Sequence, residues 1–299
     1  MDVETLTLPF RFAFMQNAFL IAALAAVPTA LLSCFLVIRG QALVGDAVAH
    51  AILPGVVLAH IIGVPLILGA FAAGMTCTVV TGYLANNSRV KQDTVLGVVF
   101  SGMFGLGLVL HVAAESGAHL DHILFGNTLG ADRGALWTTG LIGAGVTLGI
   151  AAKWKDLLLC GFDPAQARAC GLWAGVLHYG FLSALSLTVV ATLSATGLIL
   201  AIGLLITPGA IAFLLVRRFQ TMLWVAAGVN VAAMLGGTYL AFHLDSAPAP
   251  TVVLMLTALF GAAFVRHRWQ ARRAAVAGRI RGPGQGSGGP VGRQGARAR

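Results

Sequence analysis

The sequence contains few charged residues, and this scarcity indicates which class of protein it encodes. Only 10% of the 299 residues are Asp, Glu, Lys or Arg, whereas 58% are hydrophobic, and the mean hydropathy is +0.88. Soluble domains carry about 25% charged residues, so most of this surface cannot face water. The composition therefore excludes a soluble globular enzyme and indicates a protein whose outer surface faces lipid.

Several motifs are also missing. The sequence contains no Gly-Lys dipeptide, and hence no P-loop for nucleotide phosphates, and it contains neither HExxH nor GxSxG. The four cysteines lack the spacing of a zinc site or a disulfide framework, so we interpret them as packing residues. We expect no enzymatic activity and no permanently bound cofactor in this chain; an ATP-driven step would need a separate ATPase.

Long apolar stretches predict an all-α fold. A transmembrane helix needs about 20 mainly apolar residues, and we predict a polytopic transmembrane helix bundle of nine spans, within a range of eight to ten. The segment 119–130 is too short and polar to span, and it predicts an interfacial or re-entrant helix. The expected spans are residues 14–38, 46–62, 64–85, 94–113, 134–152, 173–194, 197–216, 221–242 and 250–265.

Basic residues predict the orientation, because Lys and Arg concentrate in cytoplasmic loops. Eight basic residues before the tail occupy alternate connections between the expected spans, so nine spans place these eight and the tail on one side. We therefore expect residues 1–13 outside a bacterial inner membrane and the carboxyl terminus in the cytoplasm. The residues concerned are Arg39, Arg89, Lys91, Lys153, Lys155, Arg168, Arg217, Arg218 and the arginines of the tail.

The tail accounts for the whole net charge of +9. Residues 266–299 hold nine Arg and no acidic residue, which leaves ten basic against ten acidic residues in the rest of the chain. Because residues 269–299 are rich in Gly and Arg without apolar periodicity, we expect a disordered cytoplasmic segment after a permease domain at 14–268. Its expected partner is anionic membrane lipid rather than nucleic acid.

Small residues and prolines recur within the spans. Gly69 with Ala73, and Gly97 with Ser101 and Gly105, have the spacing that lets helix backbones approach closely in lipid. We interpret both sets as bundle packing. Proline interrupts helices and is tolerated in a membrane only where neighbours satisfy the freed carbonyls, so we expect breaks or kinks at Pro28, Pro54 and Pro208.

One pair of ionisable residues lies inside an apolar span. Asp46 and His50 are four residues apart, and therefore on one helix face. An intramembrane ionisable residue indicates function, and the two donors together suit Zn²⁺ or Mn²⁺. Two ligands leave the site open, which suits transport, and water or a second copy would complete it. Two other interpretations stay open: an Asp–His hydrogen bond near a helix start, and a proton relay in a secondary carrier.

A second polar set lies in an expected extracytoplasmic connection. Glu115, His119, Asp121 and His122, together with His111, would form a funnel for cations if the preceding helix continued through them. Solvated loop residues are the more common explanation of such a set.

The connection 153–172 is long enough to dock a partner. Asp163 followed by Pro164 fits the capped first turn of a short helix. An ordinary capped loop helix would have the same sequence.

These segments together resemble the permease subunits of the zinc and manganese ABC importers, the ABC-3 family. The likeness covers about residues 14–268 and stops at the tail. Because several motifs occur in order, the resemblance is specific. It is carried by residues 39–55, which include Asp46 and His50, by residues 122–127, by Phe162, Asp163, Pro164, Ala167 and Gly171, and by residues 197–212 and 249–251.

The resemblance implies an ATP-driven importer of a divalent metal ion, with this chain as its homodimeric membrane-spanning subunit. It implies two cytoplasmic ATPase subunits that bind ATP, and an extracytoplasmic protein that delivers the metal. Asp46 and His50 would line the path, and the segment 162–171 would couple to the ATPase. A permease for a metal chelate is the alternative within this class. The donor types do not decide between zinc, manganese and iron.

Overall fold

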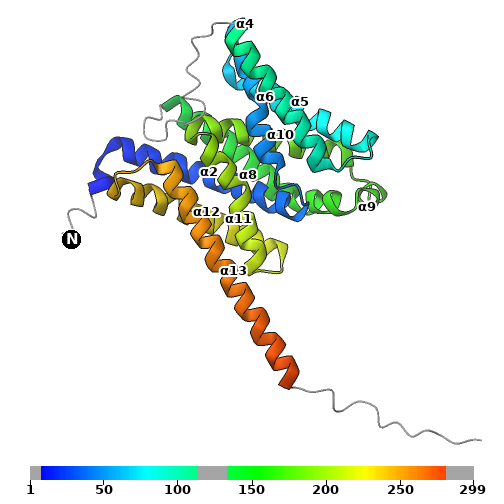
Figure 1. The fold of residues 1–299 in the computed structure, drawn as a ribbon, viewed down its shortest axis with the longest axis vertical. Helices are drawn as coiled ribbons and strands as arrows, with labels where there is room; N and C mark the ends of the chain where they lie inside the picture. Colours follow the sequence, from blue (N-terminus) through cyan, green and yellow to red (C-terminus); the bar gives the residue numbers. More distant parts are fainter. Residues whose placement is uncertain (1–7, 114–132, 281–299) are drawn as a thin grey trace, which may run out of the picture.

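The computed structural model describes residues 8–113 and 133–280, and within them all regular structure is helical (Figure 1). The all-α prediction is confirmed. The elements are η1 (Leu8–Arg11), α2 (Ala13–Ile38), α3 (Val44–Ala51), α4 (Leu53–Ile62), α5 (Leu66–Asn87), α6 (Gln92–Ala113), α8 (Arg133–Phe162), α9 (Pro164–Ala169), α10 (Ala174–Thr196), α11 (Leu198–Leu215), α12 (Phe219–His243) and α13 (Pro248–Ile280).

Nine membrane-length units occur among the described residues, as the sequence predicts. Eight are single helices, and the remaining one combines α3 and α4 across residues 44–62. The predicted re-entrant segment 119–130 lies outside the described residues, as do residues 1–7 and 281–299.

Two helices run further than the apolar stretches predict. The 30-residue α8 is about 45 Å long, against a hydrocarbon core of about 30 Å. It continues through residues 153–162, where we expected a loop, and α13 continues to Ile280, into the segment expected to be disordered. Hydrophobicity marks only the part of a helix in lipid, whereas Lys, Arg and Ala sustain the helix beyond it. In Figure 1, α13 extends far from the bundle.

The most buried span is α2, which packs against α8, α11 and α12. Its close contact with α11 includes a buried serine beside Pro208. The Ser33 hydroxyl donates to the carbonyl of Ile206 at 3.1 Å and accepts from the amide of Gly209 at 2.9 Å. These bonds satisfy backbone groups next to the proline, and α11 stays continuous there. Pro28 also lies inside a continuous helix, so a helix break occurs only at Pro54 among the three predicted positions.

Small residues bring α4 and α5 into backbone contact. A Cβ on Gly55 would lie 2.1 Å from the carbonyl oxygen of Gly69 and 2.6 Å from the Cβ of Ala73. This confirms the packing predicted for Gly69 and Ala73. In contrast, a Cβ on Gly97 or Gly105 of α6 would meet no atom within 4 Å. Among residues 8–113 and 133–280, the predicted packing of that second set is therefore absent.

Candidate functional site in the α3–α4 span

Two features position Asp46 and His50: the turn at Gly40 before α3, and Pro54 after it. Gly40, at φ +67°, ends α2 in the left-handed conformation that glycine adopts readily, and α3 begins at Val44. Pro54 follows the break at Ile52. Because Pro54 has no N–H, it cannot donate to the carbonyl of His50 four residues before it, and the span divides there.

Asp46 and His50 contact each other on the open side of α3. The Nδ1 of His50 lies 3.2 Å from Oδ1 of Asp46 and 3.0 Å from the Asp46 carbonyl oxygen. Their side chains are 30% and 27% exposed, respectively. Because a carbonyl oxygen only accepts, we assign the ring proton to Nδ1. The lone pair of Nε2 is then available to a metal, in the arrangement by which carboxylates orient metal-binding histidines.

Aromatic rings border this pair. The His50 ring centroid lies 5.8 Å from those of Phe100 and Phe104, which are one turn apart on α6. A cavity of about 20 Å³ adjoins His50 and is lined by Phe104, Leu193 and Leu198. A water molecule needs about 10–15 Å³ by this measure. The space beside the ring therefore fits a water-sized species.

The Asp46–His50 pair is incomplete as a metal site. Across residues 8–113 and 133–280, no group of three His, Cys, Asp or Glu side chains is close enough to hold a metal ion. His111 lies in the last turn of α6. The other members of the predicted funnel, Glu115, His119, Asp121 and His122, fall outside the described residues, so the funnel stays a prediction.

The predicted coupling segment forms a short capped helix. The Asp163 carboxylate accepts from the amides of Ala165 at 3.0 Å and Gln166 at 2.9 Å, and Pro164 opens α9. Ala167 is fully buried, whereas Phe162 is exposed. Gly171, at φ +77°, closes the segment after α9. The predicted cap is confirmed in geometry, and a role in coupling stays a prediction.

Arg39, used above only to predict orientation, contacts α8 and α10 beside the glycine turn that leads to the α3–α4 span. Its Nη2 donates to the carbonyl of Leu157 at 2.9 Å, and its guanidinium carbon lies 4.3 Å from the centre of the Phe181 ring. Burial lowers the pKa of Arg39 below its ordinary value, and Cys160 opposes that shift. The group stays charged near neutral pH. In the sequence, the signal for these contacts was a charged residue directly before a glycine, Arg39 before Gly40.

Phe100 and Phe104 were missed in the sequence. Their spacing of four residues places both on one helix face, which was the only available signal. Phenylalanine is common throughout the chain, with 16 copies. Only the packing of α3 against α6 shows that these two rings meet His50.

Comparison with known proteins identifies the family. The ABC 3 transport family model matches residues 11–267. The chain is 49% identical over 257 residues to the chelated iron transport system membrane protein YfeD of Yersinia pestis, covering 86% of each protein. It is 42% identical over 257 residues to the manganese transport system membrane protein MntB of Synechocystis, covering 86% of this chain and 84% of that protein.

A solved structure agrees with these relatives. PsaBC from Streptococcus pneumoniae in complex with Fab matches with a TM-score of 0.79 and 32% identity, covering 88% of this chain and 95% of that one. Both the sequence and the fold therefore point to the same assignment. The chain belongs to the ABC 3 transport family and is a membrane-spanning permease subunit of an ABC transporter.

Proposed function

We propose that this permease subunit imports a divalent metal ion, manganese or zinc, with Asp46 and His50 as transient ligands in the path. The observation that carries the proposal is their contact at 3.2 Å on a partly exposed face of α3, whose other residues are apolar. Charged groups inside a membrane are costly. Transfer of a metal ion would explain why a carboxylate and an imidazole lie together in the membrane.

The donor atoms of the pair support a metal ion as the cargo. The cavity beside His50, about 20 Å³, has room for a water-sized species. Relatives of this chain are named for manganese and for chelated iron. Carboxylate and imidazole donors suit Mn²⁺, Zn²⁺ and Fe²⁺ alike, so the donor set supports the ion class rather than one metal.

The working unit in this proposal is a homodimer. Two protein ligands are fewer than the three or four that protein metal sites use, and a second copy would supply more. The outward face of α6, with open space at Gly97 and Gly105, supports a helix contact with another chain. This face adjoins the Asp46–His50 pair through Phe100 and Phe104.

The remaining partners follow from the same proposal. ATP hydrolysis belongs to a separate cytoplasmic subunit that docks at α9, and an extracytoplasmic binding protein delivers the metal. The amino terminus lies outside the bacterial inner membrane and the carboxyl terminus in the cytoplasm. The basic residues that follow Val265 contact anionic lipid of the cytoplasmic leaflet.

The direct test is the metal content of cells. A strain lacking this gene, grown under metal starvation, should lose one metal selectively, as measured by mass spectrometry, and the wild-type copy should restore it. Unchanged manganese, zinc and iron would contradict the proposal. Uptake that persists without the ATPase subunit but collapses with the proton gradient would favour a secondary carrier instead.

Coupling through α9 gives a second test. Replacing Asp163 by Ala removes the cap of a six-residue helix, which costs about 1 kcal/mol. We expect metal-dependent ATPase activity of the reconstituted complex to fall about five-fold. Asp163→Asn is the matched control, because Asn also caps helices. Equal activity of all three proteins would show that the start of α9 does not transmit the signal.

A further inference from the structure

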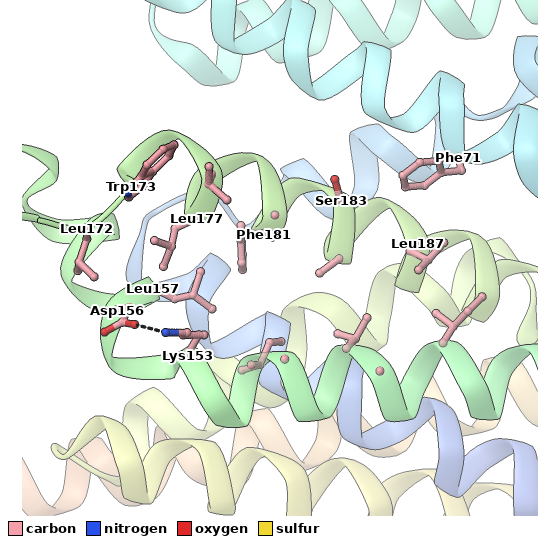
Figure 2. Close-up of a pocket in the computed structure, with 18 of the residues that line it drawn as sticks. Phe71, Lys153, Asp156, Leu157, Leu172, Trp173, Leu177, Phe181, Ser183 and Leu187 are labelled. Carbon is pink, nitrogen blue, oxygen red and sulfur yellow. Dashed lines mark ion pairs between the residues drawn. The ribbon is translucent and has the colours of Figure 1, made fainter. Parts of the chain in front are cut away.

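A groove between α8 and α10 lies apart from the Asp46–His50 pair. Its volume is about 810 Å³, and apolar side chains of α8 and α10, with Phe71 of α5, form most of its lining. Figure 2 shows Phe71 and Leu187 toward one end, and Lys153, Asp156 and Trp173 toward the other. The groove is therefore apolar along its length and polar at one end.

Glycines leave this groove open. Gly145 and Gly149 are one turn apart on α8, and Gly180 lies on α10. A Cβ at any of the three would meet no atom of the described residues within 4 Å. Leu141 and Val176 of the lining are largely exposed. In a membrane-spanning bundle, exposed apolar side chains face hydrocarbon. The chain has thus left an unfilled channel in a surface that lipid covers.

The length of the groove matches one leaflet. From Leu141 to Lys153, α8 rises about 18 Å. Half of the hydrocarbon core is about 15 Å thick. An acyl chain that lies along the groove would therefore begin near Lys153 and reach the middle of the membrane.

Charge at the polar end favours an anion. The Lys153 ammonium is 67% exposed and pairs with Asp156 at 3.3 Å, which leaves donors free among its three hydrogens. Arg39 lies behind the lining residues Leu157 and Phe181 and contacts both. Two cations thus oppose one carboxylate. Trp173, 74% exposed at this end, is a residue typical of the membrane–water interface.

We propose that this groove binds a phospholipid with an anionic headgroup, drawn from the leaflet on the Lys153 side. One acyl chain lies between α8 and α10, and the phosphate contacts Lys153. The site is independent of the proposed metal path. Because the lining includes Gly171 and Leu172, directly after α9, the headgroup would lie beside the segment proposed to couple to the ATPase.

Native mass spectrometry of the full-length chain in mild detergent tests the proposal. The probes are phosphatidylglycerol and phosphatidylethanolamine with identical acyl chains. We expect wild type to retain phosphatidylglycerol preferentially, and Gly145→Leu with Gly149→Leu, which fills the groove, to reduce the lipid-bound fraction about ten-fold. Lys153→Gln should reduce the preference for phosphatidylglycerol about five-fold. The control is Gly228→Leu, at an exposed glycine of α12 that also has open space around it.

Three results would overturn the proposal: equal retention of both lipids by wild type, undiminished binding by the filled variant, and equal loss in the Gly228→Leu control. A measurement on unaltered protein removes any dependence on variant folding. Phosphatidylglycerol with a photoreactive acyl chain should label α8 and α10 rather than α12. Labelling spread evenly over the helices, or cross-links between two copies of the chain at this groove, would also refute lipid occupancy.

Discussion

Replacing Asp46 by Asn should reduce metal uptake by roughly 100-fold. The loss of one charged contact costs about 3 kcal/mol, and each 1.4 kcal/mol lowers a rate about ten-fold. Asn keeps the shape of the side chain and removes the negative charge. It also replaces the charged acceptor that holds the His50 ring at 3.2 Å by a neutral amide oxygen, which accepts more weakly. We expect His50→Gln to have a similar effect. Initial uptake of radioactive manganese and zinc into cells gives the measurement.

The matched control is Asp245→Asn, at an exposed position after α12 and far from the pair in sequence. Asp245 has φ +49°, a conformation that Asn adopts well, so this substitution should leave uptake unchanged. The amount of each variant in the membrane fraction separates lost transport from lost protein. Wild-type uptake by Asp46→Asn at equal abundance would remove the carboxylate from the metal path.

The second large effect should come from packing. Gly55→Ala adds a Cβ that would lie 2.1 Å from the carbonyl oxygen of Gly69. Because atoms cannot approach so closely, α4 and α5 must separate. Overpacking of this kind costs about 3 kcal/mol, which is a large share of the stability of a typical domain. We expect little folded protein in the membrane, measured by monodisperse recovery in detergent and by thermal unfolding.

Gly228→Ala on α12 provides the comparison, because a Cβ there would meet no atom within 4 Å among the described residues. It should be recovered at the wild-type level. If Gly55→Ala were equally stable, the close approach of α4 and α5 would not hold in the membrane.

The fold followed from the sequence because lipid imposes simple demands. Every backbone group must be satisfied within a segment, so a run of apolar residues long enough to cross can only be a helix. Nine such units were predicted, and nine occur in the part of the chain that the structure describes. The ends of α8 and α13 were not predicted, because hydropathy marks the edge of lipid and carries no information about a helix that continues into water.

The candidate site was only partly visible in the sequence. The spacing of Asp46 and His50 placed them on one face, and Pro54 marked a break. Contacts between segments that are distant in the sequence leave no local pattern. The contacts of Phe104 with His50 and of Arg39 with Leu157 could therefore be found only in the structure. The groove between α8 and α10 was hidden for the same reason, since its glycines look like ordinary packing residues in the sequence.

Arg39 also joins three helices at one end of the bundle. Its hydrogen bond to Leu157 and its stacking on Phe181 fasten the end of α2 to the lower turns of α8 and α10. Gly40 then leads directly into the turn before α3. The Arg39 side chain is therefore a direct structural link between the end of α8 and the turn that leads to the helix of Asp46.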